Sequence, residues 1–130
     1  MIYIDSSVLL AHLLSEDRRP SGDLWDQTLV ASRLLRYEVW TRIHKRGLAN
    51  SHGEAGEALL SRIALLELSP PVLVRALQAF PIPVRTLDAL HLASVEYLRG
   101  QGQTIELATY DRRMADAARA MGIPMIDLTA

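Results

Sequence analysis

Short apolar runs alternate with longer amphipathic stretches along the whole chain. We interpret each run as a buried strand because it is short, apolar and bounded by turn or helix-starting residues. The predicted strands cover residues 1–4, 29–31, 64–68, 105–108 and 124–126. Strands that alternate with helices are typical of a parallel sheet covered on both faces. The pattern therefore predicts an α/β fold in three layers, with about five parallel strands.

Apolar residues recur at helical spacing between these runs, and capping residues mark where the helices begin. Asp5, Ser6 and Ser7 form a helix-starting cluster, and Ser32 and Thr86 are placed to cap two later helices. We expect a short helical segment over 21–25 and an extended connector over 80–84. The first of the longer predicted helices follows this cluster and ends before Arg18. The others cover 32–46, 51–63, a segment that begins at 69, 86–99 and 111–121.

The composition is that of one ordinary globular domain. Of the 130 residues, 49% are hydrophobic and 22% are charged, and no repeat or linker interrupts the pattern, so we interpret 1–130 as a single domain. Cysteine is absent, which excludes disulfides and thiolate metal sites. The first strand follows no basic leader, and no apolar stretch approaches the roughly 20 residues that cross a bilayer. We therefore expect a soluble, cytoplasmic protein without a membrane partner.

Arginine carries almost all of the positive charge. The formal net charge is -1 at pH 7, so overall basicity does not indicate nucleic acid, although a local basic patch can still bind it. The planar fork of arginine suits phosphate, but codon usage in a GC-rich genome explains the same bias. The basic residues that lie near acidic ones in the sequence are either a solvated surface or contacts for RNA. They are Arg33, Arg36, Arg42, Lys45, Arg46, Arg85, Arg112 and Arg113.

Candidate chemistry comes from four carboxylates at the predicted junctions. Asp5 ends the first apolar run, Asp88 and Asp111 open helical segments, and Glu38 lies near the start of an amphipathic helix. In an open α/β sheet, ligands bind at the rim outside the carboxyl ends of the strands. Acids gathered there would repel one another unless a cation held them. The set therefore predicts a site for a hard divalent cation with oxygen ligands.

Each acid also has an ordinary structural interpretation. Asp5 and Asp111 could cap helices, and Asp88 could favour the positive end of a helix dipole. Glu38 is harder to explain in this way because apolar residues surround it in the sequence. Asp116 is either a solvated acid or an outer metal ligand. His91, one helical turn after Asp88, could orient a carboxylate or a packed neighbour, and we favour this structural role over general base catalysis.

Four stretches of the chain resemble PIN-domain nucleases, and among them the VapC-type toxins of toxin–antitoxin pairs. They are Met-Ile-Tyr-Ile-Asp-Ser-Ser at 1–7, Tyr-Glu-Val at 37–39, Arg-Thr-Leu-Asp-Ala-Leu-His-Leu-Ala at 85–93, and Leu-Ala-Thr-Tyr-Asp-Arg-Arg-Met-Ala at 107–115. The resemblance covers the whole chain in order, and the Leu-Asp-Ala-Leu-His-Leu-Ala run is its most specific part. It implies a sheet with strand order 3-2-1-4-5.

The resemblance also implies a site and a reaction. The family's acidic quartet falls on Asp5, Glu38, Asp88 and Asp111, supported by hydroxyls at Ser6 or Ser7 and at Thr109. These acids would bind one or two Mg²⁺ or Mn²⁺ ions and cleave single-stranded or looped RNA. Both metal stoichiometries stay open because Asp116 matches a fifth family acid only imperfectly.

The same resemblance implies two protein partners: a small VapB-like antitoxin that covers the site, and a second copy of the chain in a homodimer. Trp25, Trp40 and Leu48 are expected to be exposed apolar contacts. A catalytically silent PIN-like binding module and a free-standing PIN ribonuclease are alternatives. A phosphatase or a phospho-accepting receiver is less favoured, because Ser7 stands where a phosphatase needs a second Asp and Lys45 is poorly placed for a receiver.

Overall fold

Four short parallel strands form the centre of the computed structural model, which describes residues 1–129. The strands are β1 (Ile2–Ile4), β2 (Leu29–Ser32), β3 (Ile63–Leu66) and β4 (Glu106–Ala108), in the order β3-β2-β1-β4. In the central register, Tyr3 of β1 lies between Val30 of β2 and Leu107 of β4. The carboxyl ends of all four strands therefore point to one rim of the sheet.

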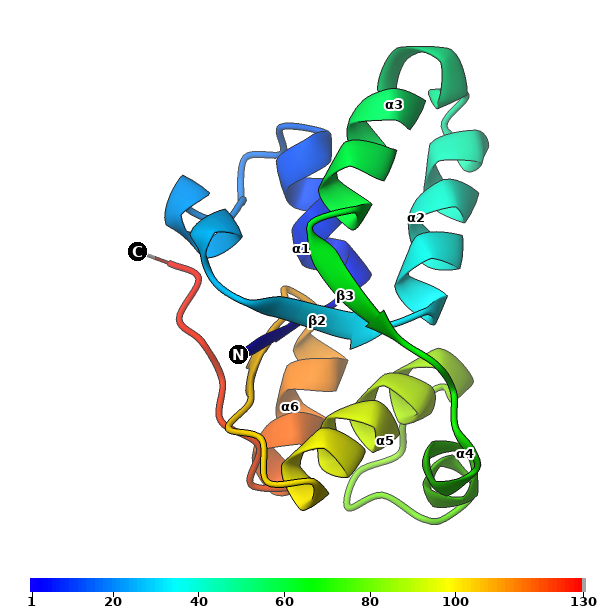
Figure 1. Cartoon of the computed structure of the whole chain (residues 1–130), viewed down its shortest axis with the longest axis vertical. Coiled ribbons are helices and arrows are strands. Elements are labelled where there is room, and N and C mark those ends of the chain that lie inside the picture. The colour runs from blue at the N-terminus through cyan, green and yellow to red at the C-terminus, as the bar shows by residue number, and fades with distance from the viewer. Residues whose placement is uncertain (130) are drawn as a thin grey trace.

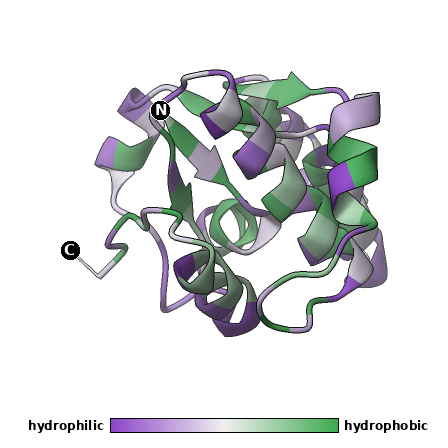
Figure 2. Cartoon of the chain, turned by 90° about the horizontal axis from the view of Figure 1, so that it is seen from below, coloured by the Kyte–Doolittle hydropathy of each residue, from purple (hydrophilic) through white to green (hydrophobic). Residues whose placement is uncertain are grey.

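Helices cover the sheet on both sides, which confirms the predicted three-layer α/β fold (Figure 1). Helices α1, α2 and α3 lie on one side of the sheet, and α4, α5 and α6 lie on the other. Their bounds are Ser6–Leu13, Leu34–Lys45, Ala49–Leu60, Pro70–Ala76, Thr86–Gly100 and Arg112–Ala120, and a 3₁₀ helix covers Gly22–Asp26. Hydrophobic residues are concentrated on the strands, as expected for a sheet buried on both faces (Figure 2).

The fifth predicted strand is reduced to one bridge. Met125 pairs with Leu107 in parallel, where the Leu107 N–H donates to the Pro124 carbonyl (2.8 Å) and the Ile126 N–H donates to the Leu107 carbonyl (3.0 Å). The segment lies beside β4, the position that the order 3-2-1-4-5 assigns to it. Because proline has no N–H, Pro124 cannot extend the ladder in the N-terminal direction.

Some predicted boundaries differ from the structure. Helix α1 ends at Leu13, before Arg18 as predicted, and Ser15 then turns the chain with a positive φ of 50°. Helix α5 has Arg85 as its N-cap without a side-chain cap, so Thr86 is its first residue rather than its cap. The Ser32 hydroxyl does accept a hydrogen bond from the Leu34 N–H (3.2 Å) at the start of α2.

The expected exposed contacts were also wrong. Trp25 is buried, and Trp40 and Leu48 are partly buried and pack against the main core. The Trp40 indole N–H donates to Glu57 of α3 (2.8 Å). Within residues 1–129, the large apolar side chains that are exposed are Met1, Tyr37, Leu73, Val74, Leu77, Ile82 and Leu87. Leu73 and Val74 lie on α4, and Leu77 is its C-cap.

Candidate functional site

The four acids singled out in the sequence line one cavity of about 600 Å³. Asp5 follows β1, Asp111 precedes α6 after β4, Asp88 lies in the first turn of α5, and Glu38 lies in α2. Because β1 and β4 are neighbours, their carboxyl ends bring Asp5 and Asp111 to the same part of the rim. Helices from both layers supply the other two acids.

Asp5 is held by hydrogen bonds on both of its oxygens. Its Oδ1 accepts from the Ser7 N–H (2.7 Å) and the Ser7 hydroxyl (2.5 Å), and its Oδ2 accepts from the Thr109 hydroxyl (2.5 Å). The Ser7 N–H contact caps α1. Burial raises the pKa of Asp5, and the bonds from Ser7 and Thr109 oppose that rise. Of the two hydroxyls that the resemblance left open, Ser7 is therefore the one that contacts Asp5.

Asp88 is buried but poorly satisfied. Within residues 1–129 its Oδ2 has no hydrogen-bond partner. The Arg85 Nε lies 3.6 Å from this oxygen, near enough for an ion pair but too far for a hydrogen bond. Burial raises the pKa of Asp88, the neighbouring Asp111 raises it further, and Arg85 opposes both. An oxygen in this state is suited to a cation.

Asp111 divides its oxygens between a helix and an arginine. Its Oδ1 caps α6 by accepting from the N–H groups of Arg113 (2.9 Å) and Met114 (3.4 Å). Its Oδ2 lies 3.5 Å from the Arg85 guanidinium. The Asp111 N–H donates to the Thr109 hydroxyl (2.9 Å), so the hydroxyl that contacts Asp5 also fixes the start of this turn.

Glu38 is oriented by a buried histidine. The His91 Nε2 lies 2.6 Å from Glu38 Oε1, and the His91 Nδ1 lies 2.8 Å from the Tyr3 hydroxyl. That hydroxyl already accepts from the Ser32 N–H (2.9 Å), so we assign its proton to His91 Nδ1 and the imidazole proton to Nε2. The chain Tyr3–His91–Glu38 thus runs from the centre of the sheet to the cavity, and His91 orients a carboxylate as proposed from the sequence.

Other candidates fall in different places. Arg42 and Arg85 line the cavity, whereas Arg33 and Arg36 form ion pairs with Glu67 and Glu57 away from it. Asp116 lies outside the cavity and pairs with Arg119 (3.5 Å).

Sequence reasoning missed Tyr3, Arg18 and Tyr110, of which Arg18 and Tyr110 line the cavity. A polar hydroxyl within an otherwise apolar strand was the only local signal for Tyr3, and the other two meet only through the fold.

The acids fit a hard divalent cation by their chemistry and by the unsatisfied Asp88 oxygen. Within residues 1–129, the side chains in their present conformations do not bring three potential ligands together around a possible metal position. Glu38 is turned to His91, and Asp111 to its helix and Arg85. Carboxylate oxygens facing one cavity are the ligands that Mg²⁺ and Mn²⁺ prefer.

The PIN-domain family model matches residues 2–120, a range that contains all four acids. The chain belongs to the PIN-domain family. Ribonuclease VapC46 of Mycobacterium tuberculosis is 36% identical over 132 residues, covering 96% of this chain and 95% of the relative. Ribonuclease VapC47 of the same species is 29% identical over 129 residues, covering 94% of this chain and 93% of the relative.

Two solved structures share the fold at lower identity. A toxin–antitoxin complex from Klebsiella pneumoniae has a TM-score of 0.64 at 16% identity, covering 92% of this chain and 94% of that one. Mycobacterium tuberculosis VapC20, described as a sarcin–ricin-loop-cleaving toxin, also has a TM-score of 0.64, at 18% identity, covering 90% and 95%. None of the helices within residues 1–129 has the length and apolar character to span a membrane.

Proposed function

We propose that this PIN-domain chain is a metal-dependent endoribonuclease and the toxin of a VapBC-type toxin–antitoxin pair. The observation that carries the proposal is the buried Asp88 oxygen without a hydrogen-bond partner, in a cavity that three further acids line. Full-length similarity to proteins named VapC ribonucleases supports the choice of RNA as substrate. The substrate class we propose is single-stranded or looped RNA.

In this proposal the four acids divide the work. Asp5 and Asp88 would hold one or two Mg²⁺ or Mn²⁺ ions directly, and Asp111 would be a ligand or would orient the attacking water. When bound, the metal would supply Lewis acidity at the phosphodiester. Glu38 would be a ligand through water or would accept the proton of the water that attacks phosphorus, while the P–O bond to the leaving oxygen breaks. Donation from His91 Nε2 holds one oxygen of Glu38, which lines the cavity.

Arginines at the cavity supply the positive charge that the chain lacks overall. Arg42 lines it from α2 and Arg85 from the start of α5. A guanidinium can bind two phosphate oxygens at once, and such contacts position an RNA backbone without reading its sequence. The net charge of -1 is therefore compatible with local binding of a polyanion.

The partners of the proposed toxin are a small VapB-like antitoxin and a second copy of the chain. The antitoxin would cover the acids and place an arginine near them. Similarity to the toxin–antitoxin complex from Klebsiella pneumoniae supports a fold that can be paired in this way.

Induced expression in a bacterial host tests the toxin role: wild type should arrest growth and Asp88→Asn should not. Equal growth of both strains at equal protein levels would contradict it.

The enzymatic proposal is tested by cleavage of a mixed structured RNA with Mg²⁺, Mn²⁺ or EDTA. Wild type and the surface variant Asp116→Asn should cleave with either metal, and Asp88→Asn should not. EDTA should stop cleavage by every variant. Cleavage in EDTA would contradict metal dependence, and no cleavage by pure wild type with any metal would favour the silent binding module.

A further inference from the structure

An arginine and a tyrosine stack against each other beside the acids. The Arg18 guanidinium carbon lies 4.7 Å from the centre of the Tyr110 ring, and Arg18 Nη2 donates to the Tyr110 carbonyl (3.4 Å). We propose that this stack is a subsite for the base of the nucleotide next to the scissile phosphate. The inference rests on the proposed ribonuclease function and names where the RNA strand continues beyond the acids.

The tyrosine is fixed to the same residues that hold the acids. Its N–H donates to the Ser7 hydroxyl (2.9 Å), which in turn donates to Asp5. Its neighbours along the chain are Thr109, which contacts Asp5, and the acid Asp111. The backbone that carries the ring is therefore held at a constant position relative to the acids. A fixed position is what a base-binding platform requires, because ordering a mobile one on binding would lower the affinity.

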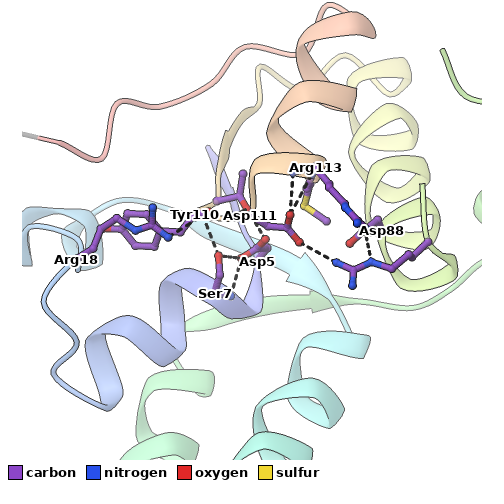
Figure 3. A network of polar contacts seen from close by, with 10 residues as sticks. Asp5, Ser7, Arg18, Asp88, Tyr110, Asp111 and Arg113 are labelled. Atoms are coloured by element: carbon purple, nitrogen blue, oxygen red, sulfur yellow. Dashed lines mark hydrogen bonds and ion pairs between the residues drawn. The ribbon is translucent and has the colours of Figure 1, made fainter. Parts of the chain in front are cut away.

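The stack stands where two cavities meet. Arg18, Tyr110 and Asp111 line the cavity of the four acids and also a second one of about 570 Å³. The second cavity adds Arg112 and Arg119 to its lining. Arg18 and Tyr110 lie on one side of Asp5 and Asp111, and Asp88 lies on the other (Figure 3). An RNA strand that crosses the acids from the Asp88 side would thus reach the stack next, and then Arg112 and Arg119.

The chemistry of the pair selects a nucleotide among anionic ligands. Unpaired RNA bases stack on aromatic rings and on arginine planes, whereas a phosphate alone needs only charge. Arg18 is exposed, so its outer face is open to a base while its inner face covers the ring. The Tyr110 hydroxyl is buried without a partner within residues 1–129, so the ring rather than the hydroxyl is the useful part.

The test measures RNA affinity in a background that cannot cleave. A fluorescently labelled single-stranded RNA of mixed sequence is titrated into Asp88→Asn, and into Asp88→Asn combined with one further change. Adding Tyr110→Leu removes the ring and should weaken binding about tenfold, the effect of losing one base stack. Tyr110→Phe keeps the ring and should restore most of the affinity. Arg99→Gln, in a cavity that none of the four acids lines, is the control.

Substitution of Arg18 gives a second variant. Because Arg18 is exposed, its replacement should leave the fold intact. Arg18→Lys keeps the charge but removes the plane, and it should weaken RNA binding severalfold. In the cleaving background, both Tyr110→Leu and Arg18→Lys should raise KM more than they lower kcat. The affinity for Mn²⁺ should not change. If a substitution disrupted the structure of the acidic site, the affinity for Mn²⁺ would fall as well.

Two results would overturn the subsite. One is Tyr110→Leu, with an unchanged melting temperature, binding RNA as tightly as Tyr110→Phe. The other is Arg18→Lys binding as tightly as wild type, since charge alone would then explain the contact. Failure of the ribonuclease proposal would give a different result. Wild type, with Arg18 and Tyr110 intact, would then cleave no RNA with any metal.

Discussion

Asp5 and Asp88 are both buried acids of one cavity, but their surroundings differ. Asp5 accepts three hydrogen bonds, from Ser7 and Thr109, whereas the Asp88 Oδ2 accepts none within residues 1–129. The first acid is part of the structure that joins β1, α1 and the end of β4. The second has one ion-pair partner within residues 1–129, the exposed Arg85 at 3.6 Å. The site thus combines one acid that the fold holds in place with another that the fold leaves open.

This difference separates stability from activity. A buried group whose hydrogen bonds are made contributes to folding, and one whose bonds are missing opposes it. A buried group without hydrogen bonds is retained where a bound ligand supplies the missing interaction. If both acids bind metal, as we propose, replacing either should abolish cleavage, but only one replacement should weaken the fold.

The largest expected effect is that of Asp88→Asn on cleavage. We expect a loss on the order of 10²–10³-fold, because a charged ligand of the proposed metal, which would stabilise the transition state, is removed. The metal-free protein should be as stable as wild type or more stable by about 1 kcal/mol, because an unsatisfied carboxylate is gone. Initial cleavage rates and urea unfolding measure the two quantities. If Asp88→Asn cleaved RNA at the wild-type rate, Asp88 would not be part of the catalytic site.

Asp5→Asn should lose cleavage to a similar extent but should also lose stability. The carboxylate accepts from three donors, and the amide cannot replace both oxygens, so we expect a loss of about 1–3 kcal/mol in the free energy of unfolding. Urea unfolding beside Asp88→Asn is the measurement. Equal stability of the two variants would mean that the comparison between the acids is incorrect.

The same comparison shows how far the sequence alone could go. The parallel α/β fold and the gathering of acids at one rim follow from local patterns, because the carboxyl ends of parallel strands lie at one edge. The order of the first four strands came instead from the resemblance to PIN-domain nucleases. The partners of each acid do not follow, since they come from distant positions. Asp5 and Thr109 meet across 104 residues, and Glu38 and His91 across 53. Nothing near Asp88 in the sequence indicates that its oxygen lacks a partner.

The errors have physical reasons of the same kind. Trp25 and Trp40 were expected to be exposed contacts for a protein partner, yet the core extends to both. The last strand was expected from three apolar residues, but Pro124 limits it to one bridge. The stack of Arg18 on Tyr110 depends on the turn at Ser15, which brings the chain back to the cavity. Tertiary contacts, rather than local propensity, decide each of these cases.

Thr109→Val tests the firmly held acid without changing its charge. The hydroxyl donates to Asp5 Oδ2 and accepts from the Asp111 N–H, so its loss leaves that oxygen and that N–H without a partner. We expect a loss of about 1–3 kcal/mol in stability. Cleavage should fall about tenfold. Thr109→Ser keeps the hydroxyl and should restore cleavage. If valine and serine gave the same rate, the hydroxyl would have no part in positioning Asp5.

The stability of the metal-free protein should depend on pH through Asp88. Its folded pKa is raised above the ordinary 3.8, first by burial and then by Asp111. Its contribution to stability is therefore fully present below pH 3.8 and is lost as the pH rises through the folded pKa. Asp88→Asn cannot ionise, so wild type should lose stability relative to this variant over that interval. Unfolding of both proteins in EDTA across the pH range measures it, and a parallel pair of curves would contradict the prediction.

The smallest expected effect concerns the cation next to the open acid. Arg85 lies 3.6 Å from Asp88 and 3.5 Å from Asp111, so it competes with a metal for both. Because Arg85 is exposed, the competition is worth about 1 kcal/mol at most, or about fivefold in affinity. Arg85→Gln should bind Mn²⁺ up to that much more tightly while binding RNA more weakly, since it loses a phosphate contact. Calorimetric titration with Mn²⁺ measures the first change, with Arg99→Gln as the matched control. Weaker Mn²⁺ binding by Arg85→Gln would mean that the arginine orders the acids instead of competing for them.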